Sequence, residues 1–293
     1  MQPRDWIFKM KTAIYYNVAE HRFCVRGDES CFSLMTNYEP FACADGEALF
    51  TLDIDSDDAP VYTEELRQED HEQMIVCGHN AAGLVVFEFG WFGETAGWLV
   101  CKADYSEGRL ITTGHHVKMA IDNALMIMFA LATADKRTVL FHAAIVSYQD
   151  KGYMFLGPSG TGKSTHARLW LQYIDGTELV NDDNPVVRIS ADGVTTVFGS
   201  PWSGKTPCYR NVCYPLGGIV MLSQAPYNKI QRLSGLQAYA ALVPSISGKR
   251  WDARIADGLH ATENTLAMQV PMWHLECLPD EAAALLCNQT IAV

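Results

Sequence analysis

Basic side chains are scarce in this chain of 293 residues. Its 22 lysines and arginines stand against 34 aspartates and glutamates, which gives a formal net charge of −12. We therefore do not expect a protein that binds nucleic acid through a broad basic surface. The acidity leaves mononucleotides open as ligands, because a nucleotide needs only one local phosphate site. Its main expected consequence is solubility.

The sequence also lacks the marks of membrane, secreted and disulfide-bonded proteins. Its most apolar run, 124–132, is far shorter than the roughly 20 residues that cross a bilayer. The N-terminus has no apolar signal segment, and the nine cysteines are odd in number, irregularly spaced and without a CxxC pair. We expect a cytoplasmic protein with reduced, mostly buried thiols, no zinc site and no membrane partner.

The remaining composition is that of a globular protein. Hydrophobic residues make up 48% of the chain, which excludes disordered and low-complexity classes. Short apolar runs between polar turns indicate a β-rich region over residues 1–113. A connecting segment, 114–137, follows it and contains a helix over 118–134. Neighbouring side chains on a helix point about 100° apart, so we expect His115 and His116 at the surface rather than on one metal ion.

Residues 138–293 carry the chemistry. Two apolar stretches, 138–146 and 153–156, predict buried strands. The next segment fits the pattern G-x-x-x-x-G-K-[ST], and a helical pattern comes directly after it. The residues predicted to hold phosphate are Gly157, Pro158, Ser159, Gly160, Thr161, Gly162, Lys163, Ser164 and Thr165.

This motif has a specific physical basis. Glycines let the backbone wrap a phosphate with its N–H groups pointing inward, and the following helix directs its positive dipole end at the same anion. Lys163 would reach the β- and γ-phosphates of ATP, and the Ser164 hydroxyl would bind Mg²⁺. A glycine-rich turn that only caps a helix is the alternative, but the strand before it and the helix after it favour phosphate binding.

Two adjacent carboxylates follow the next predicted strand, 177–180. Asp182 and Asp183 are placed to meet the phosphate site, where one could hold Mg²⁺ and the other could accept a proton from an attacking hydroxyl. A polar turn at a strand end is the alternative. The sequence contains no N-K-x-D motif, so guanine specificity has no support.

At this point the sequence resembles a known family. The segments 141–144, 157–165 and 181–183 are similar to the catalytic domain of HPr serine kinase/phosphorylase, and more so to the HPr-kinase-related P-loop proteins of bacteria. ATP-dependent phosphoenolpyruvate carboxykinase is a more distant relative. The segment 199–205, followed by a strand-like stretch, adds to the resemblance, which covers roughly residues 138–290.

The resemblance implies an α/β fold, α+β overall, with a P-loop kinase domain of the HPr kinase/phosphoenolpyruvate carboxykinase type at 138–293. It implies that His142 lies close to the transferred phosphate and that one aspartate is the general base, for which we favour Asp183 over Asp182. Lys205 has no counterpart in HPr kinases. It could contact a phosphate or an acidic substrate, or be a surface lysine. Thr165 stands where those kinases have an acidic residue.

A basic loop near residue 250 offers further substrate candidates. Arg250 or Arg254 could stabilise transition-state charge, although a mobile surface loop is the favoured interpretation. We therefore expect an ATP- and Mg²⁺-dependent kinase that phosphorylates a hydroxyl, such as a serine of a small protein or peptide, with oligomers possible. A nucleotide-binding sensor or scaffold without transfer activity, and a carboxykinase-like enzyme for small molecules, are the alternatives.

Overall fold

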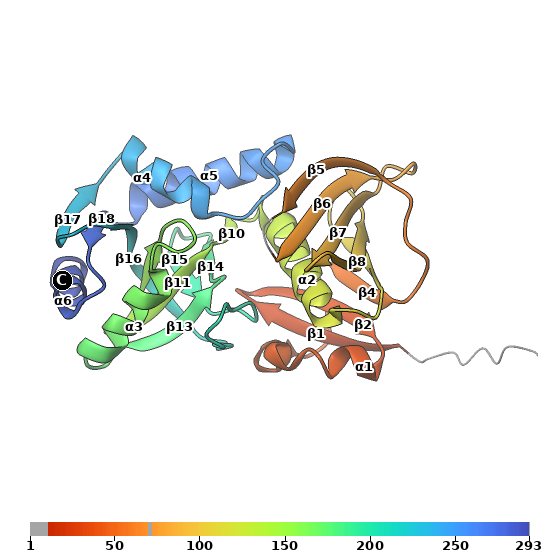
Figure 1. Cartoon of the computed structure of the whole chain (residues 1–293), viewed down its shortest axis with the longest axis horizontal. Coiled ribbons are helices and arrows are strands. Elements are labelled where there is room, and N and C mark those ends of the chain that lie inside the picture. Colours follow the sequence, from red (N-terminus) through yellow and green to blue (C-terminus); the bar gives the residue numbers. More distant parts are fainter. Residues whose placement is uncertain (1–10, 70–71, 293) are drawn as a thin grey trace, which may run out of the picture. The chain divides into compact units, whose positions relative to one another are not determined.

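The computed structural model describes residues 11–69 and 72–292. The expectation about an N-terminal signal rests on residues outside these ranges. By its contacts the chain divides into two compact units, Met1–Ala132 and Thr133–Val293 (Figure 1). Both are mixed α/β structures, and each has one large sheet. The helix that was expected in the connecting segment therefore belongs almost entirely to the first unit.

The sheet of the first unit has nine strands among the residues described, in the order β3-β1-β2-β4-β9-β8-β7-β6-β5. Most neighbours are antiparallel, while β4 is parallel to both β2 and β9. A one-turn helix, α1, and a 3-10 helix, Thr36–Phe41, lie between β2 and β3. The elements are β1 (Thr12–Val18), β2 (His21–Gly27), α1 (Glu29–Phe32), β3 (Ala42–Cys43), β4 (Thr51–Asp55), β5 (Thr63–Glu69), β6 (Gln73–His79), β7 (Val85–Trp91), β8 (Glu94–Cys101), β9 (Glu107–Thr112) and α2 (Val117–Thr133).

Helix α2 forms the core of this unit with the sheet. The ring of Phe129 meets the edge of Phe23, which itself stacks on Phe50 at 4.9 Å. At Gly108 the helix comes so close that a β-carbon there would lie 2.5 Å from the sulfur of Met128. The predicted helix and its burial are confirmed, because the apolar run within 124–132 is buried against the strands.

The second unit is built on another nine-stranded sheet, counted over the residues that the structure describes. Seven strands follow the order β10-β14-β15-β16-β12-β11-β13, and β18 pairs with β16 and β17. Its elements are β10 (Thr138–Leu140), β11 (Ala143–Tyr148), β12 (Lys151–Leu156), α3 (Lys163–Tyr173), β13 (Glu178–Asp183), β14 (Val186–Ile189), β15 (Thr195–Phe198), β16 (Cys213–Gln224), β17 (Lys229–Leu233), α4 (Leu236–Leu242), a 3-10 turn (Val243–Ser245), α5 (Ala253–Gln269), β18 (Met272–Cys277) and α6 (Glu281–Ile291).

The core of the second unit lies under α3 and α6. Trp170 of α3 is fully buried against the rings of Tyr153 and Phe155, at 5.6 and 5.5 Å. Helices α3 and α6 pack together, and α4 and α5 form a second pair (Figure 1). Burial of side chains of this size stabilises the fold by about 1.5–3 kcal/mol each. It also fixes the first turn of α3, which is part of the candidate site.

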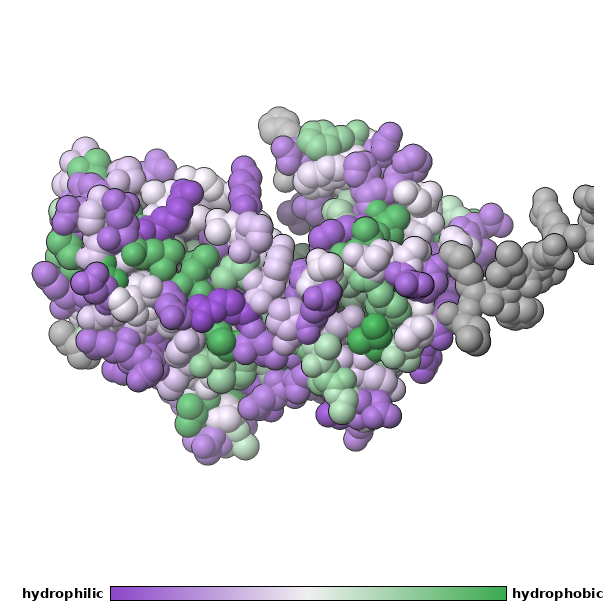
Figure 2. All heavy atoms as spheres, turned by 90° about the horizontal axis from the view of Figure 1, so that it is seen from below, coloured by the Kyte–Doolittle hydropathy of each residue, from purple (hydrophilic) through white to green (hydrophobic). Residues whose placement is uncertain are grey.

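One face of the surface is mainly polar (Figure 2). On the face seen in Figure 2, hydrophilic side chains cover most of each unit and hydrophobic ones form separate patches. None of the helices within 11–69 and 72–292 is long and apolar enough to span a bilayer. Five of the nine cysteines are buried, three are partly buried and Cys213 is exposed, in line with the expectation of mostly buried thiols.

The expected strand 138–146 is interrupted in the structure. Its first part, β10, pairs with β14, whereas its last part, β11, pairs with β12 and β13. Between them, Phe141 bridges to Ile246, and the His142 N–H donates to the Ser245 carbonyl at 2.7 Å. The prediction of one continuous strand was wrong because the apolar pattern continues while the pairing partners change.

Candidate active site

The glycine-rich segment forms a tight loop between β12 and α3. Gly157, Gly160 and Gly162 all have positive φ, of 151°, 78° and 110°. At Gly157 a β-carbon would lie 3.1 Å from the methyl group of Thr161, so the loop needs glycine there for space as well as for conformation. Gly162 precedes the first residue of α3, so the loop ends at the helix N-terminus, where unpaired N–H groups favour anions.

Lys163 folds back over this loop. Its Nζ donates to the carbonyl of Gly157 at 2.9 Å and lies 3.4 Å from that of Pro158. The side chain is buried, and this burial lowers the pKa of Lys163, while the negative charges of Asp183 and Asp182 act in the opposite direction. The lysine is therefore within electrostatic range of both carboxylates. Ser164 follows in the first turn of α3, where its hydroxyl is partly accessible.

The two aspartates lie at the end of β13 rather than beyond it. The register of β13 against β11 places Asp183 opposite Ala143 and Asp182 opposite Ala144. His142 directly precedes Ala143, the first residue of β11. Its Nε2 lies 3.4 Å from Oδ1 of Asp183. Antiparallel pairing therefore brings the predicted histidine and the predicted base together, although they are far apart in the sequence.

The pKa values of Asp183 and His142 are both shifted from their ordinary values. Burial raises the pKa of Asp183, and the charge of Asp182 adds to this, while His142 and Lys163 oppose it. Burial likewise lowers the pKa of His142, and Lys163 adds to that effect. A carboxylate with a raised pKa is a stronger proton acceptor than an ordinary surface carboxylate. The two side chains keep 37% and 47% of their surface, so a substrate can reach them.

The backbone of Asp183 is unusual. Its φ is 154°, outside the regions that L-residues normally occupy. The Asp183 carboxylate also accepts a hydrogen bond from the Asn184 side chain at 2.8 Å. Backbone strain of this kind persists only where surrounding contacts enforce it. Here the enforcing contacts come from the segment 199–206.

The segment 199–206, which we call the clamp loop, packs directly on the two aspartates. The N–H of Gly204 donates to the Asp182 carbonyl at 2.7 Å, and Ser203 bridges to Asp183. A β-carbon at Gly204 would lie 3.0 Å from the Asp182 carbonyl and 3.1 Å from Cβ of Asp183. Glycine thus permits this close approach. The exposed Lys205 is the next residue of the clamp loop.

Asn181 of β13 holds the clamp loop in place through side-chain hydrogen bonds. Its side chain is fully buried and donates to Oγ of Ser200 at 3.2 Å and to the Trp202 carbonyl at 3.0 Å. The side-chain oxygen Oδ1 of Asn181 accepts the backbone N–H of Asn184 at 2.9 Å. Ser200 completes the anchor, since its hydroxyl donates to the Asn184 carbonyl at 2.6 Å. The roles of Asn181 and Ser200 do not follow from the sequence pattern, because their partners are distant along the chain.

The two candidate arginines are engaged elsewhere. Arg250 forms an ion pair with the buried Glu263 of α5, with 2.5 Å between Nη2 and Oε1. Arg254 lies 3.3 Å from the carboxylate of Asp135. These pairs join α5 to its neighbours and indicate a structural role. Within the described part of the chain, no group of three or more His, Cys, Asp or Glu side chains is arranged as a metal site.

Comparison with known proteins gives little further guidance. No protein-family model matches the chain, and no curated protein matches it. Among solved structures, the Hpr(Ser) kinase/phosphatase from Coxiella burnetii aligns with 52% of this chain and 93% of its own length, at 12% sequence identity and a TM-score of 0.32. It is a distant structural neighbour, and the functional conclusions below rest on the site itself.

Proposed function

We propose that the chain is an ATP- and Mg²⁺-dependent kinase that transfers the γ-phosphoryl group to a hydroxyl. The observation that carries this proposal is the grouping of Lys163, Asp182, Asp183 and His142 beside a glycine-rich loop at a helix N-terminus. The loop amides and the lysine provide positive potential for phosphates, and the carboxylates provide metal binding and basicity. The resemblance to HPr-kinase-related proteins agrees with this assignment.

The protein oxygens of the site suit Mg²⁺. This ion is usually bound through one or two carboxylates together with substrate phosphates and water. Ser164 in the first turn of α3 and Asp182 at the end of β13 would be its protein ligands. When bound, the ion would neutralise charge on the β- and γ-phosphates.

Asp183 would act as the general base. It would accept the proton of the acceptor hydroxyl as the hydroxyl oxygen bonds to the γ-phosphorus and the bond to the β-phosphate oxygen breaks, releasing ADP. His142 would orient this carboxylate, and Lys163 would hold the phosphates. Because the Asp183–His142 pair is partly exposed, a serine on a peptide can approach it, and we favour such an acceptor over a small molecule. Lys205 would be a further candidate for contact with the acceptor.

The first test is nucleotide binding. Lys163→Ala should abolish binding in a titration with Mg²⁺ and ATP, whereas Lys229→Ala, which removes an exposed lysine on β17, should leave it unchanged. Unchanged binding by the Lys163 variant would contradict the proposal.

The second test is transfer. Incubation of the protein with γ-labelled ATP and a lysate of the source cells should label a protein or peptide, and Asp183→Asn should suppress this labelling. Tight ATP binding without any labelled acceptor would instead indicate a sensor or scaffold. Turnover with oxaloacetate would indicate a carboxykinase-like enzyme.

A further inference from the structure

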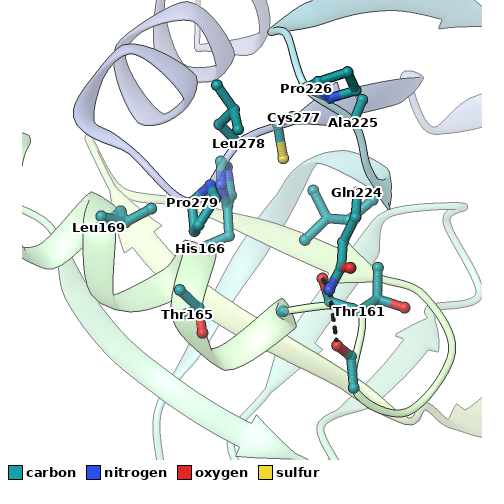
Figure 3. A pocket seen from close by; sticks show the side chains of 13 residues that line it. Thr161, Thr165, His166, Leu169, Gln224, Ala225, Pro226, Cys277, Leu278 and Pro279 are labelled. Carbon is teal, nitrogen blue, oxygen red and sulfur yellow. Dashed lines mark hydrogen bonds between the residues drawn. The ribbon is translucent and has the colours of Figure 1, made fainter.

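A cavity of about 690 Å³ opens beside the glycine-rich loop. Three segments enclose it: the loop with the start of α3, the end of β16 with the residues after it, and the turn between β18 and α6 (Figure 3). Its volume falls within the range of small-molecule sites, roughly 300–1,000 Å³. Part of the phosphate-binding loop borders it, but the residues on its other sides have no part in the functions proposed above.

Strand order explains why these segments meet. Strands β12, β16 and β18 are adjacent and parallel, with Leu156 opposite Met221 and Leu222 opposite Leu275. Their C-terminal ends therefore lie at one edge of the sheet, and the segments that follow them border the same space. Ligands of parallel sheets bind at this edge. The cavity thus lies where a nucleotide held by the loop would extend.

The walls of the cavity suit a flat, uncharged group. Leu222 contributes apolar surface. Leu169, Leu278 and Pro279 do so on one side of the space, and Pro226 does so on the side of Gln224 (Figure 3). None of the 13 lining residues is a lysine, arginine, aspartate or glutamate. Phosphates would bind at the adjoining loop, because its N–H groups and Lys163 attract anions. The neighbouring uncharged cavity is left for an apolar aromatic part of the same ligand.

His166 lines the cavity with a polar but uncharged side chain. Its ring is buried, and burial lowers the pKa of this histidine to about 4. Its Nε2 accepts the Trp170 indole N–H at 3.2 Å, so in the neutral ring the proton is on Nδ1. The ring stands between α3 and Pro279 without bringing charge into the cavity (Figure 3).

Gln224 provides a directional hydrogen-bonding group. Its Nε2 donates to the Gly160 carbonyl at 3.2 Å and lies 3.5 Å from that of Thr161 (Figure 3). Because a backbone carbonyl only accepts, the amide nitrogen must face the loop. The side-chain oxygen Oε1 is therefore directed away from the loop and is available as an acceptor at the exposed rim of the cavity.

We propose that this cavity binds the purine base of the nucleotide and that Gln224 Oε1 accepts a hydrogen bond from a 6-amino group, which selects adenine over 6-oxo purines. The inference rests on the proposed nucleotide-dependent function and adds base specificity to it. A 6-oxo purine would place an oxygen against Oε1, so that one hydrogen bond is lost and an acceptor is left unpaired. The expected discrimination is roughly tenfold in Kd.

Titrations with three ligands test the proposal. In the presence of Mg²⁺, the protein should bind ATP roughly tenfold more tightly than ITP, and tripolyphosphate more weakly than either. Gln224→Ala should bring the ATP and ITP affinities together without changing that for tripolyphosphate, which controls for damage to the loop. Gln237→Ala, on the exposed face of α4, should keep the preference.

A thiol footprint localises the base independently of any variant. Cys277 lines the cavity and is partly buried, whereas the exposed Cys213 does not line it. Burial raises the pKa of the Cys277 thiol, so maleimide labelling is run in alkaline buffer and followed by peptide mass spectrometry. MgATP should slow labelling of Cys277 but not of Cys213, and tripolyphosphate should slow neither.

The outcomes separate the two proposals. Equal binding of ATP, ITP and tripolyphosphate, or labelling of Cys277 that ATP does not slow, would overturn the base site while leaving the phosphate site intact. Preference for ATP with protection of Cys277 but no phosphoryl transfer would support the base site and contradict the kinase. Failure to bind any of the three ligands would overturn both.

Discussion

Replacement of Asn181 by alanine tests whether the clamp loop organises the active site. The Asn181 side chain is fully buried and forms hydrogen bonds with Ser200, Trp202 and Asn184. A typical hydrogen bond contributes about 1 kcal/mol net, and a buried group left without a partner costs about 1–3 kcal/mol. The Ser200 hydroxyl stays within hydrogen-bond distance of the Asn184 and Trp202 carbonyls, so the Asn184 N–H is the backbone group left without its Asn181 partner. We expect a loss of about 3 kcal/mol.

The assay is urea unfolding followed by tryptophan fluorescence. At a slope of about 2 kcal/mol/M, that loss moves the unfolding midpoint by about 1.5 M to lower urea. Asn264→Ala is the matched control, because Asn264 is exposed on α5 and its replacement should leave the midpoint nearly unchanged. A midpoint for the Asn181 variant within 0.3 M of the control (about 0.6 kcal/mol) would refute the reasoning.

The same variant separates phosphate binding from catalysis. The clamp loop contacts Asp182 and Asp183, while the glycine-rich loop and Lys163 belong to other segments. We expect phosphoryl transfer to fall more than tenfold, because a carboxylate displaced by about 1 Å is a poor base. Binding of ATP without Mg²⁺, which does not depend on Asp182 as a metal ligand, should change less than threefold in the same preparation. Equal losses in both would indicate general damage rather than a misplaced base.

Two further predictions concern the loop and the base. Gly157→Ala should weaken MgATP binding at least tenfold in a titration, because its β-carbon would press on Thr161 and on the Leu222 carbonyl; Gly193→Ala, also at positive φ but in open space, should leave binding unchanged. Asp183→Asn should lower transfer by about 100-fold or more. It should also raise stability, since the folded-state pKa of Asp183 lies above its unfolded value and the ionised form is therefore penalised above that pKa. This gain should shrink as the pH of a urea-unfolding series falls through that pKa, and a gain that grows towards acid would contradict the assignment.

The sequence was informative where the relevant residues are contiguous. The loop at 157–165 is recognisable because glycine spacing, lysine and hydroxyl all lie between one strand and one helix. The buried helix within 117–133 follows from its own apolar run. The mixed α/β class was expected from the resemblance of residues 138–290 to a kinase family.

The sequence was less informative where distant strands create the contact. No residue near His142 indicates that the predicted strand is interrupted there, because the interruption comes from the pairing of Phe141 with Ile246. Gln224 reaches Gly160 only because β16 is parallel to β12. In the sequence, Asn181 is an ordinary polar residue before two aspartates. Its role comes from its hydrogen bond to the clamp loop, which lies about 20 residues further along the chain.

Strand β16 has a mechanical consequence for the second unit. It begins at Cys213, just after Val212 accepts the N–H of Gly199 at the base of the clamp loop, and it ends at Gln224 in the cavity wall. It pairs with β15 at its start and with β12 and β18 further on, and it extends over about 40 Å. The spacing between the acceptor end and the cavity end is therefore set by one element, and its amides should be among the slowest in the unit to exchange with deuterium.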